Sequence, residues 1–170
     1  MENATPVIGF IGLGAMGNGM ARNVAAKHDG RVLAFDLDAE ALAKVTAAGA
    51  VAANSVTDLA AQCDVIFLSL PGGKQVAAVC ADIAKHGREG IIVVDLSTTA
   101  VEEARAVYAD LAAKGIAFAD APVARARTAA EDGTLSIMVG ASEALFATIN
   151  PWLSYMGTDV NRCGEVGCGD

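Results

Sequence analysis

The chain has 170 residues, of which 54% are hydrophobic, 19% charged and only 5% aromatic. This composition is that of one globular domain with a core of small aliphatic side chains, and it excludes a disordered chain. The net charge of -8 opposes attraction to nucleic acid or to an anionic membrane. Because the sequence has neither an apolar run long enough to span a bilayer nor a recognisable leader, we expect a soluble, cytoplasmic protein.

Apolar runs of strand length recur along the chain, and their nearly continuous hydrophobicity is typical of strands buried on both faces. The runs are residues 7–12, 31–36, 64–70, 91–96, 116–122 and 134–140. Between them, apolar residues recur at helical spacing, as at Val76, Val79, Cys80 and Ile83. The alternation predicts an α/β fold, a Rossmann-like, doubly wound, mostly parallel sheet with helices on both faces.

A glycine-rich segment, GLGAMG at residues 12–17, directly follows the first predicted strand and opens a predicted helix. Its three glycines allow, in order, a tight turn, close approach of phosphates and close packing of helix on strand. Backbone amides at such a turn point toward one anion, so the segment predicts a pyrophosphate site. The predicted cofactor-binding residues here are Gly12, Leu13, Gly14, Ala15, Met16 and Gly17.

An acidic residue, Asp36, ends the second predicted strand, about 20 residues after the last glycine of the loop. A carboxylate there accepts hydrogen bonds from both hydroxyls of the adenosine ribose and repels a 2′-phosphate. We therefore predict NAD as the cofactor, with NADP less favoured. Asp38 is an alternative partner for the ribose, although its position fits better as the N-cap of the next helix.

The cysteines and histidines do not form the pattern of a metal site. They are Cys63, Cys80, Cys163, Cys168, His28 and His86. We interpret all four cysteines as reduced thiols, with the first two filling the core, and both histidines as solvated. No metal is predicted.

Four segments carry motifs at the ends of predicted strands. They are GFIGLGAMGNGMARNV (9–24), SLPGG (69–73), DLST (95–98) and DAPVARARTAAEDGTLSIMVG (120–140). Together they resemble the β-hydroxyacid dehydrogenases, the family of 3-hydroxyisobutyrate and 6-phosphogluconate dehydrogenases, over essentially the whole chain. The resemblance implies hydride transfer between a nicotinamide cofactor and a small 3-hydroxy acid or its aldehyde. It also implies a second, all-helical domain that closes the site and builds a homo-oligomer.

The resemblance implies further cofactor contacts at two strand ends. Leu70 and Pro71 fall on the family's loop along the adenine-ribose and nicotinamide path, although Pro71 also simply ends its strand. Thr98 falls on the family's threonine beside the nicotinamide. Thr99 and Glu102 together predict a capping box for the following helix, which leaves Thr98 free to contact a ligand.

The substrate loop departs from the family's usual Ser-Gly-Gly. Its three residues are Ala124, Arg125 and Ala126. A guanidinium suits a carboxylate, phosphate or sulfonate, and the similarity to the sulfolactaldehyde reductase branch implies that Arg125 binds the anionic head of a small substrate. The alternative is an exposed arginine paired with Glu131 or Asp132, which is the interpretation we prefer for Arg127.

The last residues resemble the family's G-x-x-G-x-G segment, which leads into the helix joining two domains. We predict a dinucleotide-binding domain over 1–162 and the start of the interdomain segment over 163–170. By this resemblance the family's catalytic lysine would lie beyond Asp170, and Lys74 does not match its position. We therefore predict no catalytic residue in this chain. The chain should bind the cofactor but catalyse the reaction poorly. The alternatives are an imine reductase of the same superfamily and a non-catalytic nucleotide-binding module.

Overall fold

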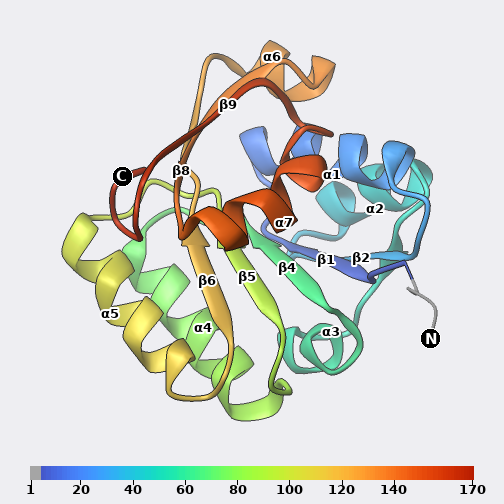
Figure 1. Cartoon of the computed structure of the whole chain (residues 1–170). Coiled ribbons are helices and arrows are strands. Elements are labelled where there is room, and N and C mark those ends of the chain that lie inside the picture. The colour runs from blue at the N-terminus through green and yellow to red at the C-terminus, as the bar shows by residue number, and fades with distance from the viewer. Residues whose placement is uncertain (1–4) are drawn as a thin grey trace.

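The computed structural model describes residues 5–170. The strands are β1 Ile8–Ile11, β2 Val32–Phe35, β3 Val51–Ala52, β4 Val65–Leu68, β5 Ile92–Asp95, β6 Ala117–Asp120, β7 Val123–Ala124, β8 Leu135–Gly140 and β9 Gly157–Gly164. The helices are α1 Ala15–Lys27, α2 Ala39–Ala47, α3 Val56–Gln62, α4 Gly73–His86, α5 Val101–Ala112, α6 Arg127–Asp132 and α7 Glu143–Leu153. Strand and helix alternate through β6, as the sequence predicts (Figure 1).

All nine strands form one sheet in the order β3-β2-β1-β4-β5-β6-β8-β7, with β9 paired to β8. From β3 to β6 every pairing is parallel, whereas β8 runs antiparallel to β6 and β7. The strand order reverses at β1, because Ile8 is in register with Val32 of β2 on one side and Val65 of β4 on the other. A doubly wound sheet binds its ligand at the carboxyl ends of the strands beside such a reversal. The predicted fold class is confirmed.

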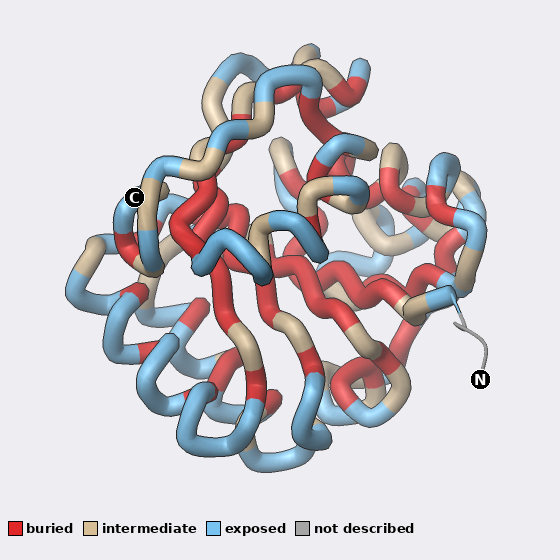
Figure 2. The backbone as a smooth tube through the Cα atoms, viewed as in Figure 1, coloured by how far each residue is buried: buried red, intermediate tan, exposed pale blue. Residues whose placement is uncertain are grey.

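The sheet is buried on both faces. Phe10 of β1 packs into a core with Met20 and Val24 of α1, to which α2, α6 and α7 also contribute. The next residue, Ile11, faces a second core built with α3, α4 and α5. Because successive side chains of a strand point to opposite faces, a fully apolar strand supplies both cores. In Figure 2 the strands accordingly form the buried centre, and the outer helices alternate between buried and exposed residues.

The predicted capping box at the start of α5 is wrong. Ala100 is the N-cap, and no side chain caps the helix. The hydroxyl of Thr99 instead donates to Oδ2 of Asp95 at 2.9 Å. Asp95 is fully buried, so its carboxylate needs donors more than the exposed end of the helix needs a cap.

The prediction that His28 is solvated is also wrong. His28 is 9% exposed and links two parts of the chain. Its Nδ1 lies 3.1 Å from the hydroxyl of Tyr155, and its Nε2 lies 2.7 Å from the carbonyl oxygen of Pro6. His86, in contrast, is exposed. The sequence gives no sign of the Tyr155 contact, because the two residues are far apart along the chain.

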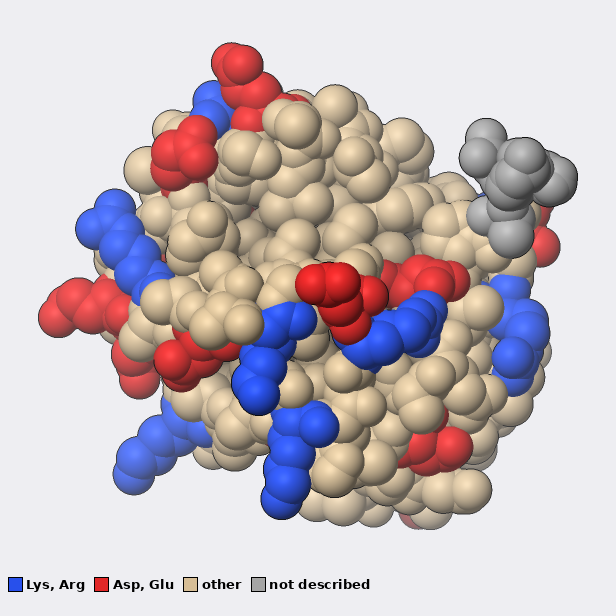
Figure 3. All heavy atoms as spheres, turned by 60° about the horizontal axis from the view of Figure 1, so that its bottom comes forward, with Lys and Arg blue, Asp and Glu red and all other residues tan. Residues whose placement is uncertain are grey.

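The surface carries charges of both signs, and the cysteines divide into two buried and two exposed thiols. Charges of both signs are interspersed on the face drawn in Figure 3. Cys63 and Cys80 are buried, and Cys163 and Cys168 are exposed, all four as free thiols. Within residues 5–170 there is no cluster of metal-ligating side chains, and none of the helices has the length and hydropathy needed to cross a bilayer.

Candidate functional site: a cleft at the carboxyl ends of the strands

A cleft of about 590 Å³ opens where β1, β4 and β5 end. It is lined by Gly12, Gly14, Ala15, Met16, Gly17, Asp36, Ser69, Leu70, Pro71, Leu96, Ser97, Thr98, Val123 and Arg125. The cleft thus brings together residues that lie more than a hundred positions apart in the sequence. Most of the residues predicted to bind the cofactor or the substrate are among them.

The glycine loop forms one wall of the cleft. Gly12 has φ +97°, and a Cβ there would lie 2.0 Å from the carbonyl oxygen of Ser69, so only glycine fits. A Cβ on Gly17 would lie 2.2 Å from the carbonyl oxygen of Gly12. Gly14 differs from both, because nothing lies within 4 Å of its added Cβ. It is exposed, it precedes α1, and no side chain caps the helix, so the first amides of α1 are free to meet an anion.

Leu13 is the one predicted loop residue that does not line the cleft. Its side chain is 1% exposed in the core, and its amide donates to Oδ2 of Asp36 at 2.6 Å. Oδ1 of Asp36 accepts the amide of Asp38 at 2.8 Å. These bonds hold the Asp36 carboxylate at the mouth of the cleft. Asp38 caps α2, accepting the amides of Glu40 and Ala41, as predicted.

A buried carboxylate organises the opposite wall. Asp95 ends β5, and its Oδ1 accepts the amide of Ser97 at 2.9 Å. The Ser97 hydroxyl in turn accepts the amide of Leu70 at 2.8 Å, which joins the loops after β4 and β5. Burial raises the pKa of Asp95, while the hydrogen bonds from Ser97 and Thr99 oppose that rise. The loops that carry Leu70 and Thr98 are therefore fixed relative to each other.

Arg125 is the one residue of the substrate loop that lines the cleft, together with Val123 just before the loop. Ala124 pairs with Ser136 in the sheet, and Ala126 is the N-cap of α6, so neither lines the cleft. Arg125 has φ +92°, a conformation that favours glycine, and its guanidinium donates to the carbonyl oxygen of Thr134 at 3.0 Å. Arg125 therefore has a backbone conformation that glycine adopts more readily than other residues.

Arg127 lies outside this cleft. Its guanidinium is 3.4 Å from a carboxylate oxygen of Glu131, one turn along α6, and its side chain is 64% exposed. This is the solvated pairing predicted for Arg127. Lys74, the lysine considered beside the ligand-facing loops, is exposed and also does not line the cleft.

Four lining residues were not predicted as site residues: Ser69, Leu96, Ser97 and Val123. Each lies within three residues of the end of β4, β5 or β6. Since ligands of parallel sheets bind at the carboxyl ends of strands, that rule could have found them all. In chemical terms the cleft offers free helix amides, one carboxylate at its mouth and one guanidinium at the substrate loop. Fold and cleft together define a dinucleotide-binding domain.

Comparison with known proteins identifies the family. The sequence pattern of the NAD binding domain of 6-phosphogluconate dehydrogenase matches residues 7–166. The chain is 43% identical over 166 residues to 2-(hydroxymethyl)glutarate dehydrogenase of Eubacterium barkeri, covering 96% of this chain and 55% of the relative. It is 36% identical over 172 residues to mitochondrial 3-hydroxyisobutyrate dehydrogenase of Rattus norvegicus, covering 99% and 51%. The chain belongs to this family of NAD-binding oxidoreductases and spans about half the length of the curated relatives it matches.

Solved structures agree with the assignment. The Mycobacterium tuberculosis 3-hydroxyisobutyrate dehydrogenase with L-serine matches with a TM-score of 0.92 and 32% identity, over 98% of this chain and 57% of that one. An imine reductase of Streptomyces aurantiacus matches with a TM-score of 0.85, over 96% and 56%, but at 21% identity. The imine reductase likeness therefore concerns the fold alone.

Proposed function

We propose that the chain is the cofactor-binding half of a dehydrogenase that transfers hydride between NAD and a small anionic 3-hydroxy acid or its aldehyde. The observation that carries this proposal is the meeting, in one cleft, of the glycine loop, Asp36 and Arg125. The loop would hold the pyrophosphate, and Thr98 would lie toward the nicotinamide. The bound nicotinamide would supply the hydride chemistry, while these side chains bind and orient.

The preference for NAD over NADP rests on Asp36. Its carboxylate already accepts two backbone amides, which fixes its position at the cleft mouth. An acceptor-only group suits ribose hydroxyls and repels a 2′-phosphate. A 2′-phosphate bound at this place would lie against the negative charge of Asp36.

The anionic substrate is argued from Arg125. Its guanidinium donates to only one carbonyl oxygen among residues 5–170, so most of its five donors are available to a ligand. The 43% identical relative acts, by its name, on a glutarate, which carries a second carboxylate in addition to that of a simple hydroxy acid. That precedent supports a substrate with an extra anionic group. A sulfonate or phosphate would satisfy the same guanidinium.

Two other functions can be distinguished from this dehydrogenase by the gene sequence. An imine reductase or a non-catalytic nucleotide-binding module would share this fold. The residues that follow Asp170 in the gene separate the three: a lysine three positions on favours the dehydrogenase, another residue there the imine reductase, and a stop codon the module. The homo-oligomer and the cytoplasmic location that we expect stay predictions.

Calorimetric titration of the chain with NAD and NADP tests the cofactor. We expect tighter binding of NAD, and Asp36→Asn should shift the NADP-to-NAD affinity ratio toward NADP by at least about tenfold, because one unit of like charge is removed. Asp38→Asn is the matched control, since it alters a neighbouring acid that faces the helix and preserves the cap. An unchanged ratio in Asp36→Asn would show that the ribose assignment is wrong.

The anion proposal is tested by the kinetics of an active enzyme that contains this chain. Arg125→Ala should lower kcat/KM for a hydroxy acid with a second anionic group much more than for its uncharged-arm analogue. Arg127→Ala provides the control, because Arg127 lies outside the cleft. Equal losses on both substrates would contradict a role for Arg125 in binding the anion.

A further inference from the structure

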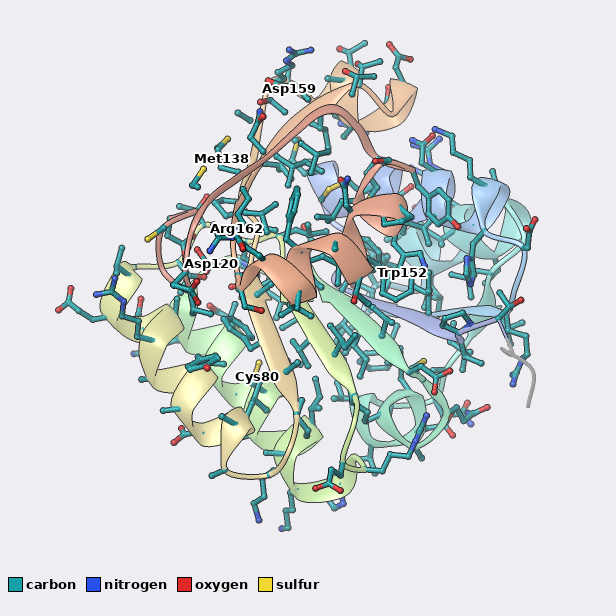
Figure 4. The ribbon with its side chains drawn as sticks, in the orientation of Figure 1. Cys80, Asp120, Met138, Trp152, Asp159 and Arg162 are labelled. Carbon is teal, nitrogen blue, oxygen red and sulfur yellow. The ribbon has the colours of Figure 1, made fainter. Side chains whose placement is uncertain are left out.

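The carboxylate of Asp120 gathers the end of the chain. Asp120 is the last residue of β6 and is fully buried. Its Oδ1 accepts the amide of Gly167 at 2.6 Å, and its Oδ2 accepts the amides of Gly169 and Asp170 at 2.9 and 3.0 Å. Figure 4 labels Asp120 at the end of β6, close to the last turn of the chain. Three amides on one buried carboxylate stabilise its negative charge by hydrogen bonding.

Glycines make this approach possible from both sides. A Cβ on Gly140 of β8 would lie 2.4 Å from Oδ1 of Asp120. A Cβ on Gly169 would lie 2.6 Å from the carbonyl oxygen of Met138 and 2.9 Å from Oδ2 of Asp120. Gly167 has φ +96°, which turns its amide toward the carboxylate. Gly167 and Gly169 thus both bring their backbone amides to Asp120.

Asp120 also lies just before the substrate loop, and Asp95, its neighbour across the sheet, holds a backbone segment in a similar way. Asp95 and Asp120 are register partners on β5 and β6. Asp95 fixes the loop after β5 through the amide of Ser97 and the hydroxyl of Thr99. Each carboxylate ends a strand and binds a different segment of backbone.

We propose that Asp120 is a positioning residue that locks the segment 167–170 to the end of β6, just before the substrate loop, so that this segment keeps a fixed place in the domain. Only the statement that the loop faces substrate rests on the proposed function. The anchoring itself depends on the contacts of Asp120 alone.

Amide hydrogen exchange of the 170-residue chain, followed by NMR, tests the anchor. Asp120→Asn turns one of the two acceptor oxygens into a donor and removes the negative charge that strengthens the hydrogen bond to the other. We therefore expect exchange at Gly167 and Gly169 to accelerate at least about tenfold. Exchange at Ser97 should stay within about twofold. Asp95→Asn is the matched variant and should show the reverse pattern. Acceleration spread evenly over β1, β4 and β5, or none at the two glycines, would overturn the proposal.

Gly169→Ala keeps the test decisive if Asp120→Asn does not fold. The added methyl should force the turn off the carboxylate and accelerate exchange at Gly167, whereas Gly72→Ala should not, because its Cβ would meet only a side-chain atom of Gln75 at 3.5 Å. Unchanged exchange at Gly167 in Gly169→Ala would overturn the anchor. Failure of the parent chain to bind NAD would instead count against the proposed function and leave the exchange result intact.

Discussion

The backbone of Arg125 is the clearest departure from local expectation in this domain. It is the one non-glycine residue with positive φ between residues 5 and 170. A side chain in that region costs of order 1 kcal/mol or more, and such costs concentrate at functional sites. A glycine at this position would avoid this cost, so Arg125 lowers the stability of the domain relative to glycine.

Replacing Arg125 by glycine should therefore stabilise the domain relative to replacing it by alanine. Both variants lose the guanidinium, but only glycine relieves the backbone, so we expect Arg125→Gly to exceed Arg125→Ala by about 1 kcal/mol in free energy of unfolding. Urea denaturation measures the difference. At Arg127, which is helical, the order should reverse, with glycine less stable than alanine. Equal stabilities of the two Arg125 variants would contradict the strain.

The four thiols should divide by reactivity. Burial raises the pKa of Cys63 and of Cys80 to about 12, so neither forms thiolate at ordinary pH. Cys163 and Cys168 are exposed. At about pH 8 we expect an aromatic disulfide reagent to modify these two in the folded chain and all four in denaturant. Cys163→Ser should lower the number of fast-reacting thiols by one. Rapid reaction of Cys80 in the folded chain would contradict its burial in the core beside α4.

At the level of elements, hydrophobic pattern and strand-end chemistry predicted β1, β2, β4, β5, β6 and β8 but not the others. β3 and β7 have two residues each, too few to show a period. β9, GTDVNRCG, is an edge strand that pairs only with β8, and its largely polar sequence shows no hydrophobic pattern. The predicted strand 116–122 in fact stops at Asp120, where the carboxylate turns to the last segment. Contacts between distant segments, such as His28 with Tyr155, leave no periodic trace.

The link between α1 and the turn after α7 should contribute to stability. Tyr155→Phe removes the hydroxyl that lies 3.1 Å from Nδ1 of His28, leaving a nearly buried ring nitrogen without its partner. We expect a loss of about 1 kcal/mol in free energy of unfolding. Tyr108→Phe is the control, since Tyr108 is 44% exposed and no hydrogen bond to its hydroxyl occurs in the described part of the chain. Equal effects of the two changes would count against the link.

Over the whole molecule, three carboxyl groups gather where β5, β6 and the last turn meet. Partial burial and the charges of Asp120 and Asp95 raise the pKa of Asp170 from 3.8 to about 7. The folded chain then holds a proton that the unfolded chain has released, so the stability from this group is present at low pH and is lost as pH rises through that window. Because Asp170 keeps contact with solvent, the effect should be modest.

Urea unfolding at about pH 5 and about pH 8 checks the sign. We expect the parent chain to lose more stability over this interval than Asp170→Asn, whose side chain does not titrate. The backbone amide that binds Asp120 is unchanged in the variant. Identical changes in the two chains would mean that Asp170 has an ordinary pKa in the folded state.

The edges of the nine-stranded sheet bear on its behaviour in concentrated solution. At one end β3 offers only Val51 and Ala52, too short a stretch to recruit a strand from another molecule. On the opposite side of the sheet, β9 is an edge because it pairs only with β8. It is long, but Asp159 and Arg162 place opposite charges along it. Unpaired edges aggregate when they are long, flat and apolar, and neither edge meets that description. The domain is therefore built to resist intermolecular sheet growth while leaving its ligand-facing end open.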